Sequence, residues 1–235
     1  MSIFLRDHPK IKYACSIKNI LLFVLLLSFS LFFQKNMLAE NKVNLLPPSF
    51  KGKVSLGEAL KKRRSRRNYT SGVLTLKELS QLLWAGYGVT AEWGAKTAPS
   101  AGALYPLRIY IVAGEVDGLS PGIYKYEPDG HFLVKISDKD KRLAFFSSAL
   151  NQSSIKSAPL SFVICADFQV TTERYGPRGK RYVFIEAGHV SQNIYLQAEA
   201  LNLATVAIGA FEDEKVKNVL GVNDTPLYIM PVGKR

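Results

Sequence analysis

The feature that most constrains this 235-residue chain is an apolar run near its N-terminus, at residues 20–33. Apart from two serines the run is wholly apolar, so it lacks the polar face of a helix that packs on a globular core. Four basic residues precede it: Arg6, Lys10, Lys12 and Lys18. A basic segment followed by such an apolar stretch is typical of a signal peptide or a signal-anchor. We therefore treat residues 1–39 as separate from the folded domain.

The function of residues 1–39 depends on whether they are cleaved. A membrane-spanning helix needs about 20 apolar residues, and the run is shorter, which favours a cleaved signal peptide. Met37-Leu38-Ala39 is a poor small-x-small cleavage site, so an uncleaved anchor stays open, and a buried core helix is a third alternative. Basic residues before the run place the N-terminus in the cytoplasm and the remainder outside. We expect an exported, periplasmic or extracytoplasmic domain, or one anchored in the membrane by residues 20–33 alone.

The remaining chain has the composition of one globular domain, which we place at residues 50–235 after a linker at 40–49. The sequence is 47% apolar and 21% charged, both ordinary values for a soluble fold. Residues 1–39 carry five Lys and Arg against one Asp, a charge of +4, so +8 of the total +12 belongs to the remainder. The domain is moderately basic, and we expect no nucleic-acid partner.

Cysteine and histidine are too sparse for a disulfide framework or a metal site. Cys15 and Cys165 lie on opposite sides of the apolar run, so its removal would leave one thiol. The three histidines are widely spaced, and no Cys pair or HExxH motif occurs. We therefore exclude metal catalysis.

Helix signals recur along the domain. Ser55 and Thr75 are each followed three residues later by a glutamate, which is the pattern of a capping box. Elsewhere, apolar and small residues recur at helical spacing, and glycines mark the ends. Four helices are predicted: one from Ser55, one from Thr75 to Gly86 or Gly88, one over 182–203, and one over 212–220 before Gly221.

Strand patterns separate these helices. Residues 107–111 alternate apolar and polar side chains, as a strand should. Residues 122–136 predict a hairpin that turns at Asp129-Gly130. Residues 160–166 and 227–232 are short apolar runs that fit buried strands, the first of them central. Because strands and helices mix without strict βαβ alternation, we predict the α+β class.

Four segments carry residues suited to a ligand. Residues 61–67 place six cations around Ser65, which fits a solvated helix end, a patch for acidic lipid or nucleic acid, or a phosphate clamp. Residues 98–106 form a loop of small residues before a strand, where backbone can approach a flat ligand, although Gly and Pro more often mark turns. The other two segments are 188–193, within the long helix, and 207–210.

Together these segments resemble a known family. Five motifs, in this order, resemble the FMN-binding nitroreductases, and most of all their SagB-like, azoline-oxidising branch. They are RRSRR, PSAGALYPL, EAGHVSQNIYLQAEAL, IGAFEDE and LYIMPVG. The resemblance covers the chain from about residue 50 onward. It implies a nitroreductase-like α+β fold, with a central mixed or antiparallel sheet flanked by helices. It also implies an intertwined homodimer with two FMN sites at its interface.

The resemblance assigns expected roles around FMN. Arg63 and Ser65 match positions that hold the phosphate and ribityl tail, and Arg67 matches a cationic position near the N1/O2 edge, where positive charge stabilises reduced flavin. The small-residue loop is expected to reach FMN from the partner chain, and residues 208–210 to lie near N5. The expected FMN-binding residues are Arg63, Arg64, Ser65, Arg67, Pro99, Ser100, Ala101, Gly102, Gln192, Asn193, Ile208, Gly209, Ala210, Lys234 and Arg235.

One side chain is a candidate for proton transfer. Azoline-oxidising relatives carry a Lys-Tyr pair shortly before the long helix, where this sequence has Arg174-Tyr175. Arginine stays protonated and is no base at neutral pH, so Tyr175 is the one catalytic candidate. His189 is expected to be structural. The sequence also lacks the N-terminal domain expected for leader-peptide binding and resembles a stand-alone member.

We therefore expect an FMN-dependent oxidoreductase that works by ping-pong hydride transfer through flavin N5 between an electron donor and a small-molecule substrate. Reduction of nitroaromatics or quinones, or a SagB-like dehydrogenation, would fit. An exported domain would meet little NAD(P)H, so the donor is open. Two alternatives are a membrane-held basic module that binds acidic lipid, without a chromophore, and a flavin-binding protein that no donor reduces.

Overall fold

A computed structural model describes residues 41–235, which form one compact unit. The predicted signal peptide or anchor, residues 1–39, lies outside the described residues. Within the part of the chain that the structure describes, no helix is both long and apolar enough to cross a membrane.

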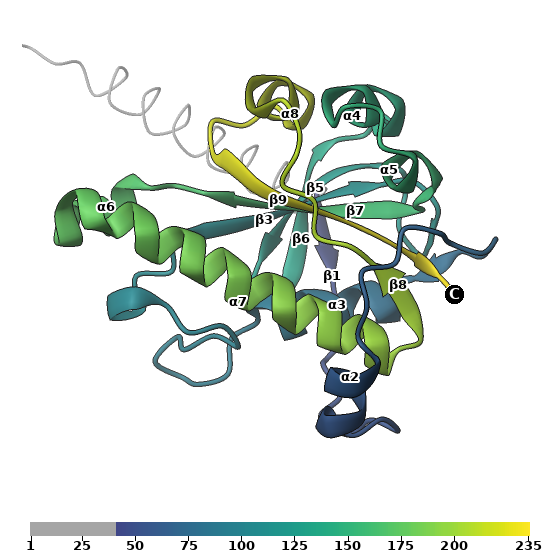
Figure 1. The fold of residues 1–235 in the computed structure, drawn as a ribbon, viewed down its shortest axis with the longest axis horizontal. Helices are drawn as coiled ribbons and strands as arrows, with labels where there is room; N and C mark the ends of the chain where they lie inside the picture. Colours follow the sequence, from purple (N-terminus) through teal and green to yellow (C-terminus); the bar gives the residue numbers. More distant parts are fainter. Residues whose placement is uncertain (1–40) are drawn as a thin grey trace, which may run out of the picture. The chain divides into compact units, whose positions relative to one another are not determined.

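A seven-stranded sheet forms the centre of the domain (Figure 1). Every neighbouring pair of its strands is antiparallel. The strands follow the order β1 (Lys42–Asn44), β6 (Phe132–Ser137), β5 (Gly122–Glu127), β3 (Leu107–Ala113), β7 (Leu160–Ala166), β9 (Thr225–Lys234) and β8 (Leu203–Thr205). A small parallel pair, β2 (Leu74–Thr75) and β4 (Val116–Asp117), lies apart from it.

Helices cover both faces of this sheet (Figure 1). On one side lie α3 (Leu76–Tyr87) and the long α7 (Gly179–Ala200), and on the other α4 (Arg142–Ser148), α5 (Ser153–Ser157) and α8 (Asp213–Leu220). Alternate residues of β3 accordingly enter two different cores: Ile109 and Ile111 pack towards α3 and α7, and Tyr110 and Val112 towards the opposite layer. The strand predicted from residue 107 is therefore confirmed, and its two faces enter two different cores.

The remaining helices are short. They are α2 (Leu56–Lys62), α6 (Gln169–Tyr175) and the 3₁₀ turns η1 (Ala101–Ala103) and η2 (Gly176–Arg178). Thr75 begins α3 with a complete capping box, as predicted, whereas Ser55 caps α2 without the reciprocal bond from Glu58, whose carboxylate pairs with Lys62 instead. The predicted end of α8 is confirmed, because Gly221 adopts the left-handed conformation at φ 73°.

Three boundaries differ from the predictions. Residues 40–49, expected as a linker, include β1, and Leu45 is buried in the core. The hairpin turns over four residues, 128–131, and not over Asp129-Gly130 alone, because both Gly130 and His131 take positive φ. The long helix, predicted over 182–203, runs over Gly179–Ala200, since Leu203 already belongs to β8.

Candidate functional site

A basic segment at residues 63–70, here called the strap, follows α2 without regular secondary structure up to the bridge at Thr70. The N–H of Arg66 donates to the carbonyl of Thr205 at the end of β8, at 2.9 Å. The N–H of Thr70 donates to the carbonyl of Lys234 at the end of β9, at 3.0 Å. Backbone pairing with the sheet thus fixes the strap and frees its side chains for other contacts.

Tyr195 of α7 connects the strap to the 207–210 segment. Its hydroxyl accepts a hydrogen bond from the N–H of Ala207 at 2.7 Å and lies 2.9 Å from the hydroxyl of Ser65. The guanidinium of Arg63 stacks over its ring, with 5.1 Å between Cζ and the ring centroid. Two segments expected to bind FMN therefore meet at Tyr195, a residue of the long helix that the sequence analysis missed. The only sequence signal for Tyr195 was its place in the motif EAGHVSQNIYLQAEAL.

The cations of the strap differ in their partners. The guanidinium of Arg64 donates to the carbonyls of Lys61 and Arg63 and so caps the C-terminal end of α2. Within residues 41–235, neither Arg63 nor Arg67 forms an ion pair with a carboxylate. These two guanidinium groups have the charge available for an anionic ligand.

The two C-terminal cations are already paired. Lys234 forms an ion pair of 2.5 Å with Glu78 of α3, and Arg235 pairs with the buried carboxylate of Glu199. Burial alone would raise the pKa of Glu78, but hydrogen bonds from Lys234 and Thr75 outweigh it and lower that pKa. In this structure both cations hold the end of β9 against its neighbours.

The segment 207–210 exposes backbone donors. Ile208 is buried and exchanges two backbone hydrogen bonds with Ile229 of β9, at 2.8 and 2.9 Å. Gly209 and Ala210 are exposed, and within residues 41–235 their N–H groups have no protein acceptor. The bridge at Ile208 thus anchors a segment that presents two free amide donors to a ligand.

The small-residue loop lies against the first half of α7. The hydroxyl of Ser100 accepts the N–H of Tyr105 at 2.9 Å, and Asn193 donates from its side-chain amide to the carbonyl of Thr97 at 3.2 Å. His189 also approaches this loop, with Nδ1 3.4 Å from the carbonyl of Pro99. Gln192, by contrast, is exposed on α7. The side chains of Asn193 and His189 on α7 therefore position the loop.

Tyr175 is brought to this loop as well. Gly102 has φ 61°, and a Cβ placed there would lie 2.7 Å from the hydroxyl of Tyr175 and 2.9 Å from Nη1 of Arg174. The positive φ favours glycine, and a Cβ there would displace the ends of both side chains, so glycine permits the close approach. The catalytic candidate and the expected flavin loop, 73 residues apart in the sequence, are thus neighbours.

Two charged residues beneath the loop escaped the sequence analysis. The ammonium of Lys96 lies over the rings of Tyr87 and Tyr105, at 4.3 and 4.8 Å from their centroids. Burial lowers the pKa of Lys96. Glu186 of α7 is 2% exposed and accepts the hydroxyl of Tyr87 at 2.7 Å; burial raises its pKa, and hydrogen bonds from Ser100 and Tyr87 oppose that rise.

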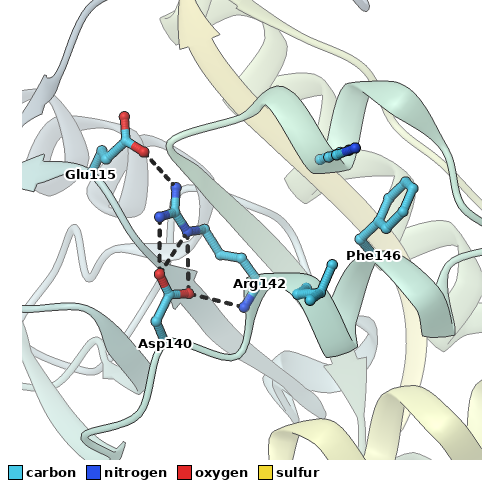
Figure 2. A pocket seen from close by; sticks show the side chains of 6 residues that line it. Glu115, Asp140, Arg142 and Phe146 are labelled. Atoms are coloured by element: carbon cyan, nitrogen blue, oxygen red, sulfur yellow. Dashed lines mark hydrogen bonds and ion pairs between the residues drawn. The ribbon is translucent and has the colours of Figure 1, made fainter.

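Two surface hollows lie elsewhere. One, of about 440 Å³, is lined by Glu115, Asp140, Arg142, Leu143, Phe146 and Lys156. Figure 2 shows that the guanidinium of Arg142 points to both acidic residues, at 2.9 Å from Asp140 and 3.0 Å from Glu115, so its charge is already neutralised. The other, of about 560 Å³, adjoins β2 and β4. None of the residues expected to bind FMN lines either hollow.

Within residues 41–235, no group of three or more His, Cys, Asp or Glu side chains is arranged so that it could hold a metal ion.

An antiparallel sheet between two helical layers, with the strap, the 207–210 segment and α7 joined at one edge, defines a protein of the nitroreductase class. The profile of the nitroreductase family matches residues 60–234, and the chain belongs to this family. The resemblance of the five sequence motifs is thereby confirmed.

Individual relatives agree with this assignment. The chain is 48% identical over 182 residues to the nitroreductase-family protein MJ1384 of Methanocaldococcus jannaschii, covering 77% of this chain and 92% of that protein. The SagB-like protein McbC of Escherichia coli, a microcin B17-processing protein, is 22% identical over 210 residues, covering 83% of this chain and 76% of McbC.

A crystal structure of a nitroreductase-family protein from Anabaena variabilis superposes with a TM-score of 0.74 at 30% identity. The match covers 82% of this chain but only 41% of the Anabaena chain. The nitroreductase-like fold predicted from the sequence is therefore confirmed.

Proposed function

We propose that this protein is an FMN-dependent oxidoreductase that works as a homodimer. The observation that carries the proposal is the junction at Tyr195, where its hydroxyl joins Ser65 of the strap to Ala207. Membership in the nitroreductase family supports the same reading. Such a junction places cations, a hydroxyl and free amides around one surface, as a phosphorylated planar cofactor requires.

The residues present fit FMN. Arg63 and Arg67 have uncompensated charge for the phosphate and for the polar edge of the ring, and Ser65 is exposed beside them. The exposed amides of Gly209 and Ala210 are donors for the ring itself. In our proposal Lys234 and Arg235 act indirectly, because their pairing with Glu78 and Glu199 holds the sheet edge on which the strap lies.

FMN, when bound, supplies two-electron hydride chemistry. The chain's own residues bind it, orient it and control protons around it. The loop at 99–102 lies beside Glu186 and His189, roughly 9 to 14 Å along α7 from Tyr195 if each residue adds about 1.5 Å. We propose that each loop serves the cofactor bound by the partner chain. Tyr175, held against Gly102, then holds or delivers a proton at the substrate.

The proposed substrate is a small molecule at an open flavin face, either a nitroaromatic or quinone that is reduced or a compound that is dehydrogenated. The azoline reaction is not simply transferable, because Arg174 stands where a lysine base would be needed. We further propose that residues 20–33 direct export or anchor the protein. A donor other than cytoplasmic NAD(P)H is then required.

The visible spectrum of the purified full chain, after incubation with FMN and desalting, tests the proposal. We expect retained flavin absorbance and its loss in Arg63→Ala/Ser65→Ala. Anaerobic bleaching by NADH or NADPH would establish a reductase and argue against export, whereas bleaching by dithionite alone would indicate another donor. A wild-type protein that retains no flavin, yet binds anionic vesicles in a salt-sensitive way, would replace the proposal with a lipid-binding function.

A further inference from the structure

The turn between α6 and α7 carries cations that have no carboxylate partner. They are Arg174, Arg178, Lys180 and Arg181, all of them exposed, and within residues 41–235 none forms an ion pair. The one acidic residue between 170 and 181, Glu173, is also exposed and accepts a hydrogen bond from Gln169 at 2.8 Å. The positive charge of this turn is therefore available to an anionic ligand.

Arg174 brings this charge to the small-residue loop. A Cβ at Gly102 would lie 2.9 Å from Nη1 of Arg174 and 2.7 Å from the hydroxyl of Tyr175, so the two side chains end at the same point of the loop. The guanidinium thus stands beside the hydroxyl that we propose holds or delivers the substrate proton. A substrate in contact with Tyr175 is within reach of Arg174.

Aromatic packing holds the guanidinium of Arg174 in place. It lies over the ring of Tyr175, with 5.4 Å between Cζ and the ring centroid. That ring packs edge-on against Tyr182, with 5.2 Å between centroids, and the hydroxyl of Tyr182 accepts a hydrogen bond from Nε of Arg178 at 3.2 Å. A cation that is ordered before binding loses less conformational entropy when a ligand arrives.

We propose that Arg174 is a specificity residue that binds a carboxylate of the substrate. This inference rests on the proposed function, because it takes Tyr175 and the loop at 99–102 to lie at the substrate. A guanidinium stays protonated and presents a planar fork that matches the two oxygens of a carboxylate, whereas lysine offers a single ammonium. The residue that is no base at this position is thus an anchor. The preferred nitroaromatic, quinone or dehydrogenated compound then carries a carboxylate.

Two probes of similar shape and different charge test this specificity. Para-nitrobenzoate and para-nitrobenzamide each reoxidise the dithionite-reduced, FMN-loaded full chain, and stopped-flow absorbance gives a second-order rate constant for each. The intrinsic reactivity of the probes cancels when the ratio of the two constants is compared between variants. We expect Arg174→Gln to lower the benzoate-to-benzamide ratio about tenfold, because a charged hydrogen bond is lost. Arg174→Lys should lie between, since it keeps the charge and loses the fork.

Lys180→Gln is the matched control. It removes the same charge from the same turn, and within the described residues Lys180 makes no hydrogen bond or ion pair. Its effect on the ratio should stay below about twofold, because an exposed charge that does not touch the ligand is screened by solvent. Equal losses in the two variants would show a general attraction of anions to a basic surface and overturn the proposal. An unchanged ratio in Arg174→Gln would overturn it as well and leave the flavin function standing.

Calorimetric titration separates this proposal from the proposed function. If the wild type retains no FMN, the flavin-free full chain is titrated with the same two probes. Tighter binding of para-nitrobenzoate that is lost in Arg174→Gln and kept in Lys180→Gln would support the carboxylate site although the flavin function has failed. Equal affinity for the two probes, or no binding of either, would overturn both.

Discussion

At the scale of single residues, the site depends on contacts that no sequence spacing reveals. Ser65 and Tyr195 are 130 residues apart, and Tyr87 and Glu186 are 99 apart, yet each pair shares a hydrogen bond. The strap and the small-residue loop could be named as candidate ligand segments from their composition, and the family resemblance then favoured that hypothesis. The residues that position them could not, because a tyrosine or glutamate at helical spacing is indistinguishable from an ordinary core or surface residue before the chain folds.

Tyr195→Phe tests the junction. The substitution removes the hydroxyl that accepts from Ala207 and contacts Ser65 but keeps the ring under Arg63. We expect FMN affinity to fall about three- to tenfold and the free energy of unfolding to fall by about 1 kcal/mol. Titration of flavin fluorescence and urea unfolding measure both. Tyr182→Phe removes an exposed hydroxyl from the same helix and should change neither; equal effects of the two variants would argue against the junction.

Gly102→Ala tests the approach of Tyr175 to the loop. A methyl group at φ 61° is strained and would press on the Tyr175 hydroxyl, so we expect a loss of about 1 kcal/mol or more in unfolding free energy. Gly188→Ala is the control, because this helical glycine has nothing within 4 Å of the added Cβ and should gain up to about 1 kcal/mol. Urea unfolding distinguishes the two. A neutral Gly102→Ala would mean that neither the backbone strain nor the contact with Tyr175 limits this position.

At the scale of elements, local signals predicted the caps of the expected helices, but the short helices α4, α5 and α6 escaped prediction. The capping residues Ser55 and Thr75 and the terminal Gly221 act within one turn of their own helix, so the sequence places them correctly. The strand β1 escaped prediction because its three residues gain stability only from pairing with β6. The alternation in β3 was likewise ambiguous, since it does not show whether its second face meets water or another layer of helices.

Lys234→Met tests how the end of β9 is held to α3. The ion pair with Glu78 is largely sheltered, with the two side chains 30% and 19% exposed, so we expect a loss of about 1 kcal/mol at neutral pH. Glu78 has a lowered pKa in the folded state, and its contribution is therefore present above its unfolded pKa and lost as the pH falls through its folded pKa.

Urea unfolding between pH 7 and pH 3 measures this dependence. The difference between wild type and Lys234→Met should shrink as Glu78 becomes protonated. Lys62→Met is the control, because its pair with Glu58 is exposed on both sides and within one helix. A difference that stays constant with pH would mean that Lys234 stabilises the edge by packing alone.

At the scale of the whole molecule, large apolar side chains remain on the surface of the single chain. Leu56 and Leu60 lie one turn apart on α2 and are 67% and 52% exposed. Leu143 of α4 is 73% exposed, but it belongs to the helical layer on the opposite face of the sheet (Figure 1). Exposed apolar residues close together favour a contact with another chain. We expect the α2 pair to belong to the proposed homodimer interface, beside the strap that follows α2.

Leu56→Glu/Leu60→Glu should therefore convert a dimer into a monomer in sedimentation velocity, because two buried charges per chain oppose association. Leu143→Glu should leave the dimer intact. The cofactor supplies a second readout: if the loop at 99–102 completes the site of the partner chain, the monomeric variant loses FMN although every residue of its own site is unchanged. A monomer that retains FMN with wild-type affinity would show that one chain builds the whole site, and the loop would then serve the substrate alone.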